Sequence, residues 1–241
     1  MLDKAVLVLD CFHPGEDVLR LTDLAVRSGL TKTTAFRLAG DLVRLGLLER
    51  EGDRYRLGGK LFELGSLVPR RQDLREIALP FLQDLFEATR ETVHLGVRDG
   101  REVVYLERIH GHDVLPLPSR IGGRLPLTCT GVGKALLAFS GDAAVEEVLA
   151  EPLPSLTRFS LTDPARLRAA LARTRSSGTA SEGQEAALGV NCIAAPVFGR
   201  DGTVVAALSV AVAQKRFRPT RLAPAVRTAA LGLSRALSAR S

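Results

Sequence analysis

Basic and hydroxyl-bearing side chains gather on one side of the segment from residue 32 to residue 45. If this segment is a helix that turns by about 100° per residue, Ala35, Leu38, Leu42 and Leu45 form one apolar stripe. Hydroxyl, guanidinium and aromatic groups on the opposite side can contact phosphates, base edges and thymine methyl groups in a DNA groove. The candidate DNA contacts on this helix are Lys32, Thr33, Thr34, Phe36, Arg37 and Arg44.

The residues before this helix predict a second helix and a tight turn. A helix over residues 22–28 is expected to end at Gly29, because glycine readily adopts the left-handed conformation that closes a helix. Thr31 is placed to cap the following helix with its hydroxyl group. The two helices together are typical of a helix-turn-helix, whose second helix enters the major groove.

The residues after this helix predict a two-stranded wing. Strands over 48–50 and 54–57 are joined by a turn at 51–53. In the second strand, Arg54 and Arg56 alternate with apolar residues and are candidate contacts to the DNA backbone. The order of helix, turn, helix and basic wing predicts a module that reads double-stranded DNA.

Charge and composition agree with a polyanionic partner. The chain of 241 residues is 46% hydrophobic and carries a formal net charge of +6. Residues 31–60 contain seven basic and four acidic side chains, so the positive charge is concentrated on the proposed reading helix and wing.

Cysteine usage and the first residues predict a cytoplasmic protein. Cys11, Cys129 and Cys192 are far apart and odd in number, which does not suit a disulfide framework. Asp3 and Asp10 interrupt the opening apolar stretch, so it does not read as a signal peptide. No apolar run has the length of a membrane span, and no membrane partner is expected.

The pattern of elements predicts an α+β chain in three parts. These are a winged helix-turn-helix over 1–58, a linker helix and joint over 59–72, and an effector-binding and oligomerisation domain over 73–241. The last part mixes helices with short antiparallel strands, as a sensor domain does. Its strands are expected at 92–97, 102–108, 114–118, 190–198 and 203–212, and its helices at 73–90, 133–139, 143–149, 164–177 and 219–237.

Two other chemistries have weaker patterns. A phosphate-binding loop at residues 131–135 would need glycine at Thr128 and serine or threonine at Ala135. His94, His110 and His112 are candidate metal ligands, but no cysteine or acidic cluster has the matching spacing. We therefore expect no metal and no cofactor, and a metal-sensing regulator stays an alternative.

A small-molecule enzyme is the other alternative. It would use Cys192 as nucleophile with Glu182 or His94 as partner. A reactive cysteine needs a positive or histidine-bearing setting, whereas the residues next to Cys192 in the sequence are apolar or neutral. We therefore expect no catalytic residues.

The whole chain resembles the IclR family of bacterial transcription regulators. Four segments, in this order, carry the resemblance: SGLTKTTAFRL, GRLPLTCTGVGKALLAF, EGQEAALGVNCIAAPVF and VVAALSVAV. The resemblance implies an N-terminal winged helix, a linker helix and a C-terminal effector domain similar to GAF domains. It also implies homodimers that often pair into tetramers on DNA.

The resemblance further implies which residues bind an effector. They are Thr130, Gly131, Glu182, Cys192, Ser209 and Ala211. Glu182 stands where some members have aspartate, and Ala211 where they have a second serine, which weakens the case for a glyoxylate-like or pyruvate-like ligand. By themselves, Cys192 and Ser209 also fit small buried strand residues, and Glu182 also fits the cap of a surface turn.

These observations together predict a ligand-controlled DNA-binding regulator. One winged helix touches few base pairs, so we expect a symmetric dimer on a palindromic operator. The opening helix and residues 60–68 are the expected dimer contacts. The expected effector is a small organic acid, aromatic acids included, and both repression and activation fit this interpretation.

Overall fold

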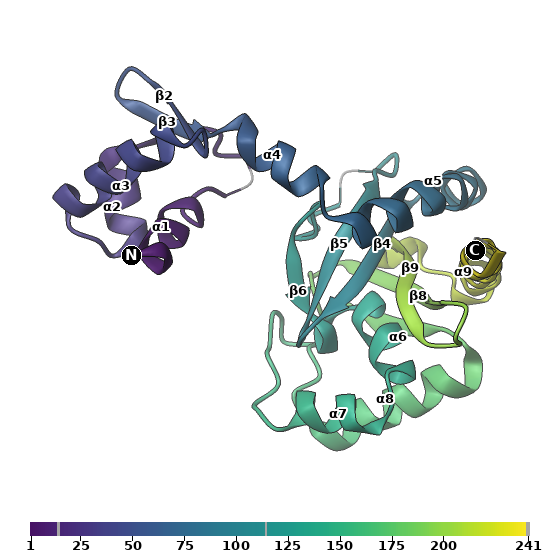
Figure 1. The fold of residues 1–241 in the computed structure, drawn as a ribbon. Helices are drawn as coiled ribbons and strands as arrows, with labels where there is room; N and C mark the ends of the chain where they lie inside the picture. Colours follow the sequence, from purple (N-terminus) through teal and green to yellow (C-terminus); the bar gives the residue numbers. More distant parts are fainter. Residues whose placement is uncertain (14, 114, 240–241) are drawn as a thin grey trace. The chain divides into compact units, whose positions relative to one another are not determined.

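The computed structural model describes residues 1–13, 15–113 and 115–239 and divides the chain into two compact units. These units are Met1–Gln72 and Asp73–Ser241. The first is a small helical unit with a three-stranded sheet, and the second is built on a six-stranded antiparallel sheet (Figure 1). The α+β expectation is therefore confirmed.

The N-terminal unit has the expected winged helix-turn-helix. Its elements are α1 (Leu2–Leu9), β1 (Leu19–Arg20), α2 (Leu21–Ser28), α3 (Lys32–Arg44), β2 (Leu48–Glu51), β3 (Arg54–Leu57) and α4 (Gly59–Ser66). The sheet order is β1-β3-β2, so the wing gains a short third strand. Its core is formed by apolar residues of these helices and strands, among them Val8, Leu24, Leu38, Leu42, Leu48 and Tyr55.

Local capping fixes the two helices of the helix-turn-helix. Gly29 adopts φ 67° and ends α2, while the Thr31 hydroxyl accepts a hydrogen bond from the backbone N–H of Thr34 at 3.3 Å. Helix α2 begins one residue earlier than expected, because the Asp23 carboxylate accepts from the backbone N–H of Arg20 at 2.9 Å. Leu45, expected on the buried stripe, follows the end of α3 and is 55% exposed.

The joint expected at residues 69–72 is helical instead. Helix α4 ends at Ser66, and α5 runs from Pro69 to Thr89. Proline is favoured in the first turn of a helix, where its missing N–H leaves no bond unmade. The interruption between the helices therefore falls at residues 67–68.

The C-terminal unit is a sheet between two layers of helices. Its strands, in the order β6-β5-β4-β9-β8-β7, are β6 (Arg124–Pro126), β5 (Glu102–Ile109), β4 (Thr92–Asp99), β9 (Val204–Ala213), β8 (Val190–Phe198) and β7 (Ala180–Gly183). Helices α5 and α9 (Pro219–Ala239) cover one face. The other face carries α6 (Gly131–Phe139), α7 (Asp142–Leu149) and α8 (Pro164–Ser177) (Figure 1).

Two features of this sheet differ from expectation. Residues 115–118 form no strand, and Val114 lies outside the described residues. Pro116 and Pro118 have no N–H to donate to a strand partner, which explains the irregular backbone. The edge strand β7 was not expected from the sequence, and it carries Glu182.

Gly133 of the GVGKA motif allows α6 to pack closely against the residues before it. A Cβ atom on Gly133 would lie 2.1 Å from the backbone oxygen of Leu127, so only glycine fits there. The motif thus lets α6 start directly against the preceding 3-10 turn (Leu127–Cys129).

Candidate DNA-contacting face and effector pocket

The proposed DNA contacts on α3 lie mostly in solvent. Lys32, Thr33 and Arg37 are exposed, and so is Phe36, at 52% of its surface. Thr34 is half-buried, and its hydroxyl is hydrogen-bonded to that of Thr31 at 2.9 Å. Thr34 therefore takes part in the helix cap as well as facing the reading side.

The four arginines of the reading face differ in their partners. Arg44 pairs with Asp41 at 3.1 Å, and Arg56 pairs with Glu49 at 2.7 Å. Arg37 and Arg54 form no ion pair within the part of the chain that the structure describes. The latter two guanidinium groups are therefore free to meet phosphates or bases without first leaving a carboxylate.

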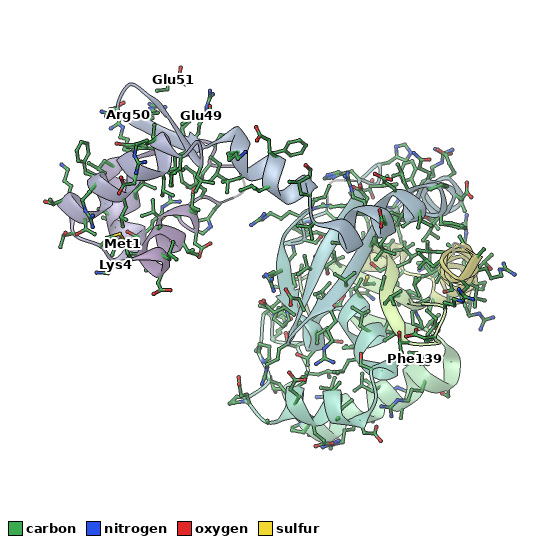
Figure 2. All side chains as sticks on the ribbon, in the orientation of Figure 1. Met1, Lys4, Glu49, Arg50, Glu51 and Phe139 are labelled. Atoms are coloured by element: carbon green, nitrogen blue, oxygen red, sulfur yellow. The ribbon has the colours of Figure 1, made fainter. Side chains whose placement is uncertain are left out.

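The wing holds one further arginine that was not expected from the sequence. Arg50 on β2 donates to the backbone oxygen of Gly52 at 2.9 Å and lies 5.7 Å from the centre of the Tyr55 ring. Figure 2 labels it on the wing, together with Glu49 and Glu51. Arg50 lies opposite Tyr55 in the register of β2 and β3. Two-residue alternation therefore places Arg50 on the same face of the wing as the buried Leu48.

Glu49 joins the wing to the start of α4. Its carboxylate accepts from Arg56 at 2.8 Å and from the backbone N–H of Gly59 at 3.3 Å. The hydrogen bond from Arg56 is the main reason that the pKa of Glu49 is lowered. The carboxylate thus satisfies a free N–H group of the first helical turn.

The six proposed effector residues meet at one cavity of the C-terminal unit. About 360 Å³ of empty space, part of it open to solvent, lies between β4, β5, β6, β7, β8, β9, the start of α6 and two irregular segments, 117–119 and 186–187. The sheet register explains this meeting, because Glu182 pairs with Cys192 and Cys192 with Ala211 across three neighbouring strands. Thr130, Gly131 and Ser209 complete the group.

Glu182 is a buried carboxyl group at the edge of the cavity. One of its oxygens accepts hydrogen bonds from the backbone N–H groups of Glu185 and Ala186. Burial raises the pKa of Glu182 from 4.5 to about 7, so its protonated form is populated near neutral pH.

A buried ion pair lies next to this carboxyl group. Lys134 of α6 contacts Glu185, and the side chains are only 1% and 8% exposed. The second carboxylate oxygen of Glu185 has no hydrogen-bond partner within the described part of the chain. The pair therefore depends on a single contact between two nearly fully buried side chains.

Cys192 has the setting of an inert thiol. Burial, reinforced by Glu182, raises its pKa to about 12, so the thiol stays protonated. His94 is also at the cavity, but its hydrogen bonds go to two serines. This geometry does not supply the base that a cysteine nucleophile needs.

The start of α6 presents backbone donors to the cavity. The Thr130 side chain accepts from the N–H of Gly133 at 2.9 Å and so caps the helix. The first N–H groups of a helix have no acceptor within it, and they favour an anion. Thr130 and Gly131 therefore offer a place for a carboxylate.

Three polar side chains of the cavity were not expected in the effector site. His94, Tyr105 and Ser119 line it together with the six expected residues. His94 and Ser209 are direct neighbours in the register of β4 and β9, so two-residue alternation would have placed both on one face. The sequence holds no comparable signal for Ser119, which reaches the cavity from an irregular segment.

Neither a membrane-spanning helix nor a metal cluster is found in the described part of the chain. Among residues 1–13, 15–113 and 115–239, no helix has both the length and the apolarity to cross a bilayer. Within the same ranges, no three histidine, cysteine or acidic side chains are grouped to hold a metal ion.

Known protein families match both units of the chain. Residues 67–235 match the model of the bacterial transcriptional regulator IclR C-terminal domain, and residues 1–52 match the IclR helix-turn-helix domain. The HTH-type transcriptional regulator XynR of Escherichia coli is 37% identical over 98% of this chain and 96% of its own length.

Two solved structures are similar over nearly the whole chain. An IclR homolog from Microbacterium hydrocarbonoxydans, complexed with 4-hydroxybenzoate, has a TM-score of 0.89 at 32% identity and 99% coverage of both chains. The IclR of Thermotoga maritima has a TM-score of 0.81 at 30% identity and 98% coverage of both chains. With domain models that match both units, this chain belongs to the IclR family of bacterial transcription regulators.

Proposed function

We propose that this regulator binds a palindromic operator and that a small organic acid in the C-terminal cavity sets its affinity for DNA. The observation that carries the proposal is the meeting, at one cavity, of the six residues that the family resemblance implies as effector contacts. The 4-hydroxybenzoate bound by the Microbacterium homolog supports an aromatic acid as the ligand class.

The cavity suits an acid that also carries a hydroxyl group. Its carboxylate would lie at the N–H groups near Thr130 and Gly131. Protonated Glu182 would tolerate this anion and can accept from or donate to a ligand hydroxyl. Ala211, in place of a second hydroxyl-bearing residue, leaves room for a ring.

The DNA-contacting face would be used twice in a homodimer. Its proposed contacts are Lys32, Thr33, Thr34, Phe36, Arg37, Arg44, Arg54 and Arg56. Exposed apolar residues on α1 and α4, such as Leu2 at 82% and Phe62 at 82%, support these helices as dimer contacts. Pairing of dimers into tetramers is part of the same proposal. Sedimentation that shows a monomer at micromolar concentration, with and without operator DNA, would contradict it.

A thermal-shift series with 4-hydroxybenzoate and related aromatic acids tests the ligand class. A ligand that binds only the folded state raises the melting temperature by mass action. Cys192→Trp should fill the cavity and abolish the shift while leaving operator binding intact in fluorescence anisotropy. A folded Cys192→Trp variant with the wild-type ligand response would remove this cavity as the effector site.

A further inference from the structure

A chain of three hydrogen-bonding side chains crosses the wall of the effector pocket. His94 of β4 contacts the Ser209 hydroxyl through Nδ1 at 3.4 Å and the Ser119 hydroxyl through Nε2 at 2.8 Å. Ser209 belongs to β9 in the centre of the sheet, whereas Ser119 belongs to the irregular segment between β5 and β6. The imidazole ring therefore links the central sheet to an irregular part of the pocket wall.

The His94 ring is held in its neutral form. It is only 3% exposed, and burial lowers its pKa to about 3, with Arg108 and His110 adding to the effect. The Tyr105 ring packs beside it, with ring centroids 5.2 Å apart. A neutral imidazole has one donor nitrogen and one acceptor nitrogen, so the two serine contacts cannot have the same direction.

The segment 115–119 depends on few contacts. Leu115 and Leu117 pack against the cluster of Val190, Cys192 and Ala211 at the pocket. At its end, Ser119 is fixed twice, by the His94 ring and by a hydrogen bond from Arg108 to its backbone oxygen. The proline at 116 and the proline at 118 keep it out of the sheet, so these contacts replace strand pairing.

We infer that His94 is a positioning residue of the effector pocket. It passes the contact that the bound acid makes with Ser209 on to Ser119, and so to the segment 115–119. The inference rests on the proposed function of this pocket. The bound ligand would set the direction of the two hydrogen bonds between His94 and the serines.

The direction of the two His94–serine hydrogen bonds follows from the number of protons that each group can donate. A ligand oxygen that accepts the Ser209 proton leaves that hydroxyl able only to accept from His94. Nδ1 must then carry the proton, and Nε2 must accept from the Ser119 hydroxyl. A ligand group that donates to Ser209 frees the Ser209 proton for Nδ1, which allows both bonds to reverse. The tautomer of His94 thus reports whether the ligand group at Ser209 accepts a hydrogen bond, as a carboxylate does, or donates one, as an ammonium group does.

Imidazole nitrogen NMR tests the relay directly. The chain has only four histidines, so ¹⁵N-histidine labelling gives few signals, and loss of a signal in His94→Gln assigns His94. We expect His94 to stay neutral between pH 5 and 8 and to adopt the Nδ1–H tautomer when the wild type is saturated with 4-hydroxybenzoate. An unchanged His94 signal at saturation, or the Nε2–H tautomer, would overturn the inference.

Hydrogen exchange tests the link to the wall without a ligand. Ser119→Ala removes the far contact and should speed amide exchange in peptides covering 115–121 by about three- to tenfold, since one buried hydrogen bond is lost. His94→Gln should have the same effect. If His94→Gln does not fold, Ser119→Ala alone decides the test. Ser181→Ala, an exposed serine on β7, is the matched control. Equal exchange in Ser119→Ala and the control would contradict the relay.

Binding by the variants separates this inference from the proposed function. We expect both variants to bind 4-hydroxybenzoate about tenfold more weakly than the wild type, with Ser181→Ala unchanged. Wild-type affinity in a folded Ser119→Ala variant would overturn the relay while leaving the effector site in place. A wild type that 4-hydroxybenzoate does not stabilise would instead remove that acid as effector, and the exchange experiment would still decide the role of His94.

Discussion

The proposed DNA contacts all lie between Lys32 and Arg56 and mostly face solvent, whereas the pocket collects buried side chains from five strands and the start of α6. The first region presents charged side chains to solvent. The second contains groups whose charge is suppressed by burial, such as the carboxyl of Glu182. Changes on the face should therefore alter DNA binding at constant stability, and changes at the pocket should alter stability and pH response.

The largest effect is expected at the buried ion pair beside the pocket. Lys134→Met leaves Glu185 buried without its cation, which should lower the free energy of unfolding by about 3–5 kcal/mol. The double variant with Glu185→Gln should recover much of this loss, because no charge remains unpaired. Urea unfolding followed by circular dichroism measures both, since the chain has no tryptophan.

An exposed pair on the same unit gives the control for this experiment. Arg168 and Glu146 are in contact at 2.5 Å with side chains 49% and 60% exposed, so Arg168→Ala should change stability little. A loss in Lys134→Met no greater than in this control would show that burial of the Lys134–Glu185 pair does not make the protein sensitive to loss of its cation.

The next effect concerns the pH dependence of stability at Glu182. Its pKa is raised from 4.5 to about 7 in the folded state, so its contribution is fully present below pH 4.5 and is lost as the pH rises through 7. The shift corresponds to about 3 kcal/mol. Glu182→Gln keeps the acceptor oxygen for Glu185 and Ala186, and it should be more stable than the wild type at pH 8 by this order. Parallel stability curves for the two proteins from pH 5 to pH 8 would contradict the raised pKa.

Local patterns predicted the helix pair and its caps well. The two helices, their glycine turn and the threonine cap depend on neighbouring residues, so their spacing is visible in the sequence. The structure differs from the sequence-based expectation where one specific side-chain partner determines a helix boundary or the pairing of an arginine. Asp23 moves the start of α2, and the partners Asp41 and Glu49 distinguish four arginines that look alike in the sequence.

The pocket could be predicted only through resemblance, because tertiary pairing assembles it. Nothing near Glu182 in the sequence shows that it lies opposite Cys192, and β7 itself was missed as a short edge strand. Ser119 was missed because proline-bounded, irregular backbone has no periodicity. From the sequence, His94 is a candidate only for a metal ligand or a base, because its two serine partners are 25 and 115 residues away in the chain.

A smaller effect is expected for DNA recognition by the reading helix. Arg37 is exposed and unpaired within the described residues, so Arg37→Ala should weaken specific binding by about five- to 150-fold and relax sequence preference. Arg44→Ala, which removes a cation already paired with Asp41, should cost less. Anisotropy on operator and scrambled duplexes measures both, and the melting temperature should not change. A larger loss for Arg44→Ala than for Arg37→Ala would reverse the assignment of the base contact.

The smallest effect separates the two wing arginines through the salt dependence of binding. Arg54 has no carboxylate partner within the described part of the chain, so Arg54→Gln should reduce the slope of log affinity against log salt by about one unit on any duplex. Arg56 is already neutralised by Glu49, and the double variant Glu49→Gln with Arg56→Gln removes the pair without changing the net charge. The glutamine introduced for Glu49 still offers an oxygen to the N–H of Gly59, so the start of α4 is kept. The double variant should therefore retain a slope near that of the wild type. A fall of one unit in the double variant would show that Arg56 leaves Glu49 to bind a phosphate, and that both arginines of β3 contact the DNA backbone equally.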